Sequence, residues 1–468
     1  MNITFLIGNG FDVKLGMKTR YIDFYKSYVA GFSKTEPQVV KTFKSEINDF
    51  IKAEIQKEDS EIDWRDLEVA LGKYTSKVPL EDFETLYFDI IDHLKSYLES
   101  ELEYFDARYY RQEDFLKFLC NPVSGFFNHD NESDIIKFAR SFSGEDIIDI
   151  ITFNYTPTVE MLSGFDDKEL PIGKTLSNRA GKIRSVRHIH QSLDDEDILI
   201  GVNDKSQIEN PEYTKNQDVC ELLVKPDTNR VLGKGIDAEC CSVIDNTDLF
   251  VLFGSSAGIT DRKWWRRICN RLSSATPSHA RMLFFVYRPE DVRHREIRYG
   301  KWSREDIGHF VRSSGLDADF YDKVSSSIYV SYSLDMFKMS IIENAFSIPK
   351  ELNHNYLKAD VKVTLIKSAL RYIVARVDAP NDELGVKAEY DWIKAVFPNY
   401  KVGLQAKFEM EVKGTKLPFD RITISNGKNR KDLYFDISSF YGRRTVTSLA
   451  DFEKAILNKI EVDNHFPK

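Results

Sequence analysis

The hydrophobic pattern opens with a short apolar run at residues 3–7 that stops at a Gly-Asn-Gly turn. A run of this length that ends in glycine indicates a buried strand. Apolar residues then recur at intervals of three and four over residues 39–55 and again over residues 80–105. This spacing predicts two long amphipathic helices whose apolar stripes pack into a core.

Strand-like apolar runs return in the middle of the chain. They cover residues 147–153, 186–190, 198–202, 249–253, 282–287 and 328–332. Several are apolar on both faces, as parallel strands covered by helices are, and helical spacing lies between some of them. Strands that alternate with helices indicate an α/β fold, here a Rossmann-like doubly wound parallel sheet. Residues 20–145 are then a large helical insertion after the first strand.

The pattern changes after Ala345. From about residue 355 the chain shows strand-like runs and a closing helix, at residues 361–377, 402–412, 421–425, 433–437 and 449–460. We therefore expect two domains, one over residues 1–345 and a smaller C-terminal α+β domain over residues 355–468. The second shows no catalytic pattern. We expect it to be dispensable for folding of the first and to act in activation or partner choice.

Composition and charge narrow the class of protein. The chain has 468 residues, 42% of them hydrophobic and 30% charged, as globular proteins do. Its formal net charge of −9 argues against broad, charge-driven binding to nucleic acid. No apolar run is long enough to span a membrane, the N-terminus does not resemble a signal peptide, and the 5 cysteines show no CxxC spacing. We expect a cytoplasmic protein with reduced cysteines and no membrane contact.

The first candidate site is the segment after the opening apolar run. Its residues are Gly8, Asn9, Gly10, Phe11 and Asp12. Ligands of open α/β sheets bind beyond the carboxyl ends of strands, and a glycine-rich turn lets backbone N–H groups approach a phosphate. We expect this segment to contact a nucleotide, and Gly10→Val to abolish binding with the fold intact. An ordinary tight turn is the alternative.

Two further loops follow predicted strands. Asn154 ends the run at residues 147–153, and its amide can bind ribose hydroxyls or hold a water, although an Asx-turn would also explain it. The other loop follows the run at residues 249–253. Its small residues let a ligand approach the backbone, and Thr260 or Asp261 is the candidate N-cap of the next helix. Its ligand-binding candidates are Gly254, Ser255, Ser256 and Asp261. We expect the N-terminal turn, Asn154, His190 and Ser255 to line one cavity at the carboxyl edge of the sheet.

His188 and His190 stand two residues apart in a predicted strand, which would put both imidazoles on one face. They can be a metal pair, one general acid/base histidine beside a structural one, or two structural histidines. No carboxylate or cysteine stands at a recognisable ligand spacing, so we expect no metal ion at this pair. Gly173-Lys174-Thr175 is not a P-loop, because Lys168 stands where that motif needs a glycine.

Together these segments resemble the AbiH family of bacteriophage abortive-infection proteins. The resemblance covers roughly residues 1–345. It is carried by the Gly-Asn-Gly-Phe-Asp turn at 8–12, Leu-Gly-Met-Lys-Thr at 15–19, aromatic residues at 21–25, Phe-Asn-Tyr-Thr at 153–156, His-Ile-His at 188–190, Gly201 with Asn203, and the segment 253–265 with its Thr-Asp and Trp-Trp pairs. It implies a role in phage defence.

At a second level, the order of these segments is similar to that of sirtuin-like NAD-binding domains. This resemblance implies NAD as the ligand. Asn154 would engage the nicotinamide ribose or a water, and His190 would be the base at that ribose. Asp12 would stabilise developing positive charge. The remaining nucleotide contacts would come from the N-terminal turn, Gly201, Asn203 and the Gly254–Asp261 loop, with Ser255 and Ser256 at the adenosine end.

The leading hypothesis is a defence effector that binds NAD or a related nucleotide and hydrolyses its N-glycosidic bond to deplete the infected cell. A second is a non-catalytic nucleotide-binding sensor or adaptor, which Gln191 favours because glycine usually follows the sirtuin histidine. A third is a metal-assisted nuclease or phosphoesterase that uses His188 and His190. A phage-derived trigger or a defence partner protein is expected besides the nucleotide, and self-association into a homo-oligomer stays open.

Overall fold

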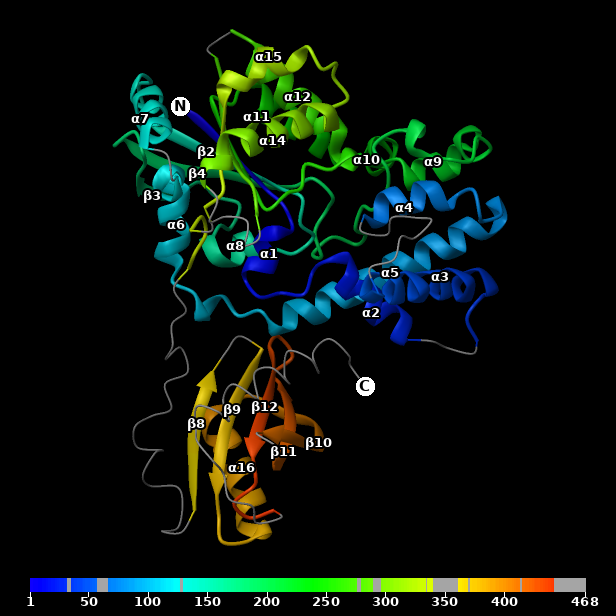
Figure 1. The fold of residues 1–468 in the computed structure, drawn as a ribbon, viewed down its shortest axis with the longest axis vertical. Coiled ribbons are helices and arrows are strands. Elements are labelled where there is room, and N and C mark those ends of the chain that lie inside the picture. The colour runs from blue at the N-terminus through cyan, green and yellow to red at the C-terminus, as the bar shows by residue number, and fades with distance from the viewer. Residues whose placement is uncertain are drawn as a thin grey trace. The chain divides into compact units, whose positions relative to one another are not determined.

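The computed structural model describes residues 1–31, 35–56, 66–126, 129–275, 279–288, 296–333, 335–339, 361–368, 371–412 and 415–441 (Figure 1). Contacts divide the chain into two units. The first comprises Met1–Leu98 and Arg111–Ser340, and the second comprises Glu99–Tyr110 and Ile341–Lys468. The expected boundary at residues 345–355 and the expected closing helix at 449–460 lie outside the described residues. No helix in the described ranges is long and apolar enough to cross a membrane.

The first unit is built on a 7-stranded sheet with the order β3-β4-β2-β1-β5-β6-β7. Neighbouring strands are parallel except for β3, which pairs antiparallel with β4. The mixed α/β fold with a mostly parallel sheet is therefore confirmed. The strands are β1 (Asn2–Ile7), β2 (Asp146–Thr152), β3 (Leu170–Lys174), β4 (Ala180–His188), β5 (Leu249–Phe253), β6 (Arg281–Phe285) and β7 (Ile328–Ser331).

Helices fill the chain between the first two strands, as the sequence predicts. The two long apolar stripes form α3 and α5, and α3 buries Val40, Phe43 and Ile47. Burial of such a stripe is what stabilises a helix of this length. These helices are α1 (Gly10–Lys14), α2 (Tyr21–Ala30), α3 (Gln38–Gln56), α4 (Leu67–Tyr74), α5 (Leu80–Tyr104), α6 (Gln112–Cys120) and α7 (His129–Arg140).

Apolar residues cover both faces of the sheet because side chains alternate along each strand. On one face Leu6, Phe250 and Phe284 pack against Trp265 of α12 and Phe310 of α14. The other face carries an aromatic cluster whose members include Phe5, Phe11, Phe115, Phe253, Phe285 and Phe337. The later helices of this unit are α8 (Thr158–Ser163), α9 (Gln217–Leu223), α10 (Lys225–Leu232), α11 (Ile236–Asp245), α12 (Arg262–Ser273), α14 (Tyr299–Ser313) and α15 (Phe320–Val324).

One strand prediction is wrong, and one strand was not predicted. The apolar run at residues 198–202 is a buried loop, in which Val202 forms an isolated bridge with Val224. Its apolar side chains are buried although the backbone does not pair as a strand. The apolar run therefore indicated burial and not a strand. The antiparallel edge strand β3 was not predicted, because Pro171 and Gly173 argue against a strand. Both are tolerated here since β3 lies at the sheet edge and its register shifts between these two residues.

The second unit contains a 5-stranded sheet with the order β10-β11-β12-β9-β8. The predicted run at residues 361–377 is an antiparallel pair, β8 and β9, and β12 pairs parallel with β9. Helix α16 was not predicted, because Gly385 and Ala388 interrupt its apolar stripe. The elements are β8 (Lys362–Ser368), β9 (Tyr372–Asp378), α16 (Asp382–Val396), β10 (Lys401–Val412), β11 (Thr415–Ser425) and β12 (Arg430–Asp436).

Residues Glu99–Tyr110 pack within the second unit although they precede most of it in the chain. The Arg371 guanidinium lies 4.1 Å from the centroid of the Tyr104 ring and forms an ion pair with Glu101. The Lys431 ammonium lies 4.1 Å from the centroid of the Tyr109 ring. A cut after residue 345 would therefore divide this unit.

We expect a truncated chain of residues 1–345 to be less stable than the full chain by about 3–5 kcal/mol, since Glu101 loses the cation it is buried against. Urea denaturation of both chains measures the difference. The full-length variant Arg371→Met, which removes the same cation but keeps the second unit, is the control. Equal stability of the truncated and full chains would show that residues 99–110 fold without the second sheet.

Candidate functional site

The loops that follow β1, β2 and β5 meet at one edge of the sheet. Ile7 pairs with Thr152 on one side and with Phe253 on the other, so the three strands end at the same level. The Gly10 N–H donates to the Gly254 carbonyl over 2.7 Å, which ties the first and third loops together. Because the strands are parallel, all three loops leave from their carboxyl ends, where ligands of such sheets bind.

A cavity of about 1440 Å³ opens at this edge, and all of its lining residues belong to the first unit. Its size exceeds that of most single-ligand pockets. The expected shared cavity of the N-terminal turn, Asn154, His190 and Ser255 is present. The predicted site residues that line it are Gly8, Asn9, Gly10, Asp12, Asn154, His190, Gly254, Ser255, Ser256 and Asp261. Their roles toward a ligand stay predictions.

Gly8 and Gly10 allow the loop after β1 to pass in close contact with the loop after β5. A Cβ on Gly10 would lie 2.7 Å from the Cα of Gly254, and one on Gly8 would lie 2.7 Å from the Gly254 carbonyl oxygen. The N–H groups of Gly8 and Gly10 already donate to the carbonyls of Phe253 and Gly254. Gly10→Val would force these loops apart, so the expectation that this variant leaves the fold intact is wrong. Any phosphate must be held mainly by other groups.

Three other predicted site residues do not line this cavity. Phe11 is buried in the aromatic cluster, where its ring centroid lies 5.8 Å from that of Phe115. Gly201 allows the backbone of Leu223 to approach so closely that a Cβ would lie 2.1 Å from its carbonyl oxygen. The Asn203 side chain accepts a hydrogen bond from the Lys263 N–H over 2.9 Å, in the first turn of α12. These contacts are structural.

Asp12 is buried beneath the turn that follows β2. Its carboxylate accepts hydrogen bonds from the hydroxyls of Thr156, over 2.5 Å, and Thr158, over 2.7 Å. Burial raises the pKa of Asp12 to about 6, although these hydroxyls and the nearby Asn154 amide act to lower it. Asp12 therefore joins the first and second loops, and its carboxyl group can exchange a proton near neutral pH.

Asn154 lines the cavity, and its side-chain amide is buried beside Asp12. Its side chain is 4% exposed, and neither Nδ2 nor Oδ1 has a hydrogen-bond partner of good geometry among the described residues. A buried amide without partners is costly unless a ligand or water satisfies it. Its backbone is held by His188, whose Nδ1 lies 2.7 Å from the Asn154 carbonyl oxygen and whose Nε2 lies 2.8 Å from Glu160 Oε1.

The two histidines do not form a pair, which corrects the prediction that they share one face of a strand. β4 ends at His188, so His190 lies beyond the strand. His188 contacts Glu160 and Asn154, whereas the Nε2 atom of His190 contacts Asp261 and Lys225. Burial would lower the pKa of His188, but Glu160 outweighs it and raises that pKa. Within the described ranges no group of three or more His, Cys, Asp or Glu side chains could hold a metal ion.

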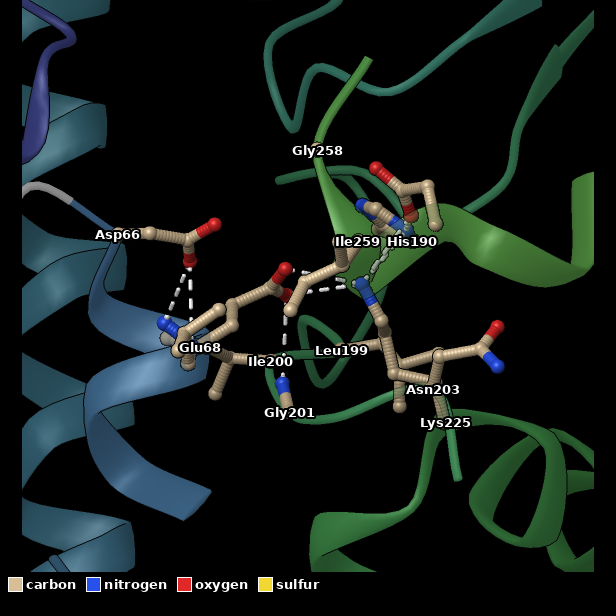
Figure 2. Close-up of polar contacts among 12 residues, drawn as sticks. Asp66, Glu68, His190, Leu199, Ile200, Gly201, Asn203, Lys225, Gly258 and Ile259 are labelled. Carbon is tan, nitrogen blue, oxygen red and sulfur yellow. Dashed lines mark hydrogen bonds and ion pairs between the residues drawn. The ribbon is translucent and has the colours of Figure 1, made fainter. Parts of the chain in front are cut away.

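His190 belongs to a buried network of charged side chains, which Figure 2 shows. Its Nε2 lies 3.0 Å from Asp261 Oδ1 and 3.3 Å from the Lys225 ammonium nitrogen. The Lys225 ammonium also contacts Asp261 Oδ1 at 3.2 Å and the two carboxylate oxygens of Glu68 at 3.1 and 2.9 Å. The imidazole packs near the rings of Phe153 and Tyr155, whose centroids lie 5.8 and 6.2 Å away.

The charges of this network compensate one another. Burial by itself would raise the pKa of Asp261, but the Lys225 ammonium and the hydrogen bond with His190 outweigh it and hold that pKa well below its usual range. Burial would likewise lower the pKa of Lys225, but Asp261 and Glu68 raise it. Asp261 and Lys225 therefore stay ionised at neutral pH although both are buried.

Basic side chains line the cavity beside the first turn. The side chain of Asn9 exchanges two hydrogen bonds with Thr19, which fixes the segment that carries Arg20. Arg20 is exposed and has no ion pair with any described residue. Burial lowers the pKa of Lys14, which also lines the cavity, to about 8. Lys14 and Arg20 flank the Leu-Gly-Met-Lys-Thr stretch at residues 15–19, and the sequence alone did not assign either cation to the site.

Sequence reasoning also missed an acidic wall that comes from the helical insertion. Asp66 and Glu68 stand at the start of α4, and both line the cavity. Asp66 caps the helix through the N–H groups of Glu68 and Val69, and burial raises its pKa to about 6. The cavity therefore carries cations beside the first turn and carboxyl groups on α4.

Comparison with known proteins gives one match. A family model described as "Bacteriophage abortive infection AbiH" matches residues 4–284, more than half of the chain. No curated protein and no solved structure gives a significant match. The matched region begins in β1 and ends in β6, and it includes the three loops, His190 and α4. The resemblance in the motifs is thereby confirmed, and the chain belongs to the bacteriophage abortive infection AbiH family.

Proposed function

We propose that this chain is an anti-phage effector whose first unit binds NAD or a related nucleotide in the cavity and hydrolyses its N-glycosidic bond. It would act in the cytoplasm and deplete an infected cell of the nucleotide. We infer that the sheet at whose edge this cavity lies is Rossmann-like and doubly wound. Membership of a phage abortive-infection family supports the defence role.

One observation carries the nucleotide proposal. Asn154, whose buried amide has no hydrogen bond of good geometry to a described residue, and His190 line one cavity, which the cations Arg20 and Lys14 also line. A nucleotide diphosphate needs such cations, whereas its ribose needs an uncharged donor and acceptor. Gln191 does not oppose this reading. It has a φ of 64°, in the left-handed region that glycine adopts most easily, so the chain keeps the turn that a glycine would make.

The reaction would break the bond between C1′ of the ribose and the ring nitrogen of nicotinamide. Nicotinamide leaves with the bonding electron pair, and the ribosyl cation is captured by water. Asn154 would orient the ribose or the water, and His190 would accept the proton that the water loses. Asp12, buried beneath Asn154, would favour the positive charge that develops on the ribose. The products are nicotinamide, ADP-ribose and a proton.

The direct test is to incubate the purified full chain with NAD and to follow nicotinamide release, with and without phage lysate. We expect release in at least one condition. Tight binding of NAD by calorimetry without release in either condition would favour a non-catalytic sensor. If the chain shows no binding of NAD and no release of nicotinamide in either condition, the proposal is refuted.

Arg20→Ala should weaken binding of NAD about tenfold or more, because a charge-assisted contact to phosphate is lost. Calorimetry measures the effect. Arg140→Ala is the matched control, since Arg140 is an exposed arginine at the end of α7 and does not line the cavity. Equal affinity of Arg20→Ala and the parent chain would place the diphosphate elsewhere.

A further inference from the structure

Lys225 is a buried lysine that stands at the start of α10, and its side chain is 7% exposed. Backbone hydrogen bonds fix its position, because the Lys225 N–H donates to the Val202 carbonyl and the Val202 N–H donates to the Leu223 carbonyl. The ammonium reaches three elements that lie apart in the sequence. These carry Glu68 on α4, His190 after β4, and Asp261 before α12.

The contacts of His190 allow two arrangements of its proton. Nε2 can donate to Asp261, which leaves Nδ1 as an acceptor, or it can accept from Lys225, which puts the proton on Nδ1. The Asp261 oxygen is the nearer atom, at 3.0 Å against 3.3 Å for the ammonium, and it is a charged acceptor. Nδ1 itself has no hydrogen bond to any described residue.

We propose that Lys225 is a positioning residue, which keeps Asp261 ionised and so holds His190 in the tautomer with its proton on Nε2 and with Nδ1 free to accept a proton from bound substrate or water. This inference rests on the proposed function, in which His190 is the base. Lys225 touches no reacting atom. It acts through Asp261, while Glu68 supplies the second negative charge that makes a buried ammonium tolerable.

Lys225 also explains why α4 belongs to the site. Glu68 Oε1 accepts from the Gly201 N–H at 3.3 Å as well as from Lys225, so the carboxylate connects the helical insertion to the loop at residues 198–202 (Figure 2). The acidic wall on α4 and the base His190 are thereby held in one arrangement by a single ammonium. A neutral side chain at position 225 would leave Glu68 and Asp261 facing each other across the gap.

The test compares Lys225→Met with Lys44→Met in the full chain. Lys44 is a matched control because it is also buried, forms an ion pair with Glu36 at 2.7 Å and does not line the cavity. We expect Lys225→Met to lower kcat about 30-fold or more with KM changed less than about threefold. Lys44→Met should keep the kcat and KM of the parent chain.

A second readout does not depend on turnover. Ring-nitrogen NMR shifts of ¹⁵N-histidine-labelled chain, with His190 assigned through His190→Gln, report its tautomer. We expect the Nε2-protonated form in the parent chain and a mixture in Lys225→Met. If Lys225→Met does not fold, the double variant Lys225→Met, Glu68→Gln removes the carboxylate that Lys225→Met leaves unpaired. We expect the same mixture of His190 tautomers in this double variant. Lys225→Arg, which keeps the charge, should restore part of the parent tautomer.

The outcomes separate the two proposals. A parent chain that neither binds nor cleaves NAD refutes the proposed function, whereas loss of the Nε2-protonated form in Lys225→Met still supports the positioning role. Ring-nitrogen shifts in Lys225→Met identical to those in Lys44→Met overturn the inference, whatever the activity of the parent chain.

Discussion

Asn154→Ala is expected to abolish nicotinamide release, with a loss of at least about 100-fold, and to leave thermal stability unchanged or slightly higher. The side chain is buried and its amide forms no hydrogen bond of good geometry with the described residues, so its removal costs the folded state only the weak contact of the amide with Asp12. Turnover should suffer because a methyl group cannot orient a ribose hydroxyl or a water. A residue that function needs and stability does not is typical of a binding site.

Nicotinamide release and thermal unfolding of the same preparation measure the two effects. Thr158→Val is a suitable comparison, because it removes a buried hydroxyl that does have a partner, Asp12, and should lower stability. If Asn154→Ala unfolds at a much lower temperature than the parent chain, the amide is a structural group whose partners were underestimated. Unchanged turnover in a stable Asn154→Ala variant would remove Asn154 from the reaction.

His190→Ala is expected to lower turnover by about 100- to 10,000-fold, the range in which removal of a general base falls. Its effect on stability should be moderate, because Asp261 keeps the Lys225 ammonium as a partner when the imidazole is lost. The loss should appear in kcat more than in KM, since the base acts on the water and not on ground-state binding. Cells that express the variant should also lose protection against phage.

His188→Ala is the control for this second prediction. His188 bridges Glu160 and the carbonyl of Asn154, so its loss should destabilise the chain and disturb Asn154 without removing the base. Comparable losses of turnover in both variants at unchanged stability, together with co-purifying zinc, would favour a metal-assisted hydrolase. Full phage protection by His190→Ala would show that defence does not depend on this chemistry.

Much of the fold follows from local patterns. The strand at residues 249–253, the helical insertion and the long stripes of α3 and α5 were predicted close to their observed bounds. Burial of one helix face imposes a period on the sequence, and burial of both faces of a strand gives a short continuous apolar run. The errors arise where burial occurs without that period. The run at 198–202 is buried as a loop, and Gly385 and Ala388 interrupt the apolar stripe through which α16 packs. The edge strand β3 was missed because its proline and glycine are acceptable only at an edge.

The sequence likewise predicted one part of the candidate site and not the other. The sequence alone marked the loops after β1, β2 and β5, since glycine, asparagine and serine at strand ends are local signals, and parallel strands bring such ends to one edge. It could not distinguish Gly10, which permits a loop crossing, from a glycine that faces a phosphate, because both roles need the same absent side chain. It also suggested a pair of histidines that the end of β4 separates.

Only the tertiary structure decided how His190 is held. Lys225 is 35 residues from His190 in the sequence and 157 from Glu68, and nothing near it distinguishes it from a surface lysine. A buried charge is stable only when opposite charges surround it, and those charges come here from three distant segments. The local sequence therefore determined most strands of the first sheet, the loops that follow β1, β2 and β5, and the family of this chain. The charges that orient its candidate base depend on long-range packing, which no local pattern encodes.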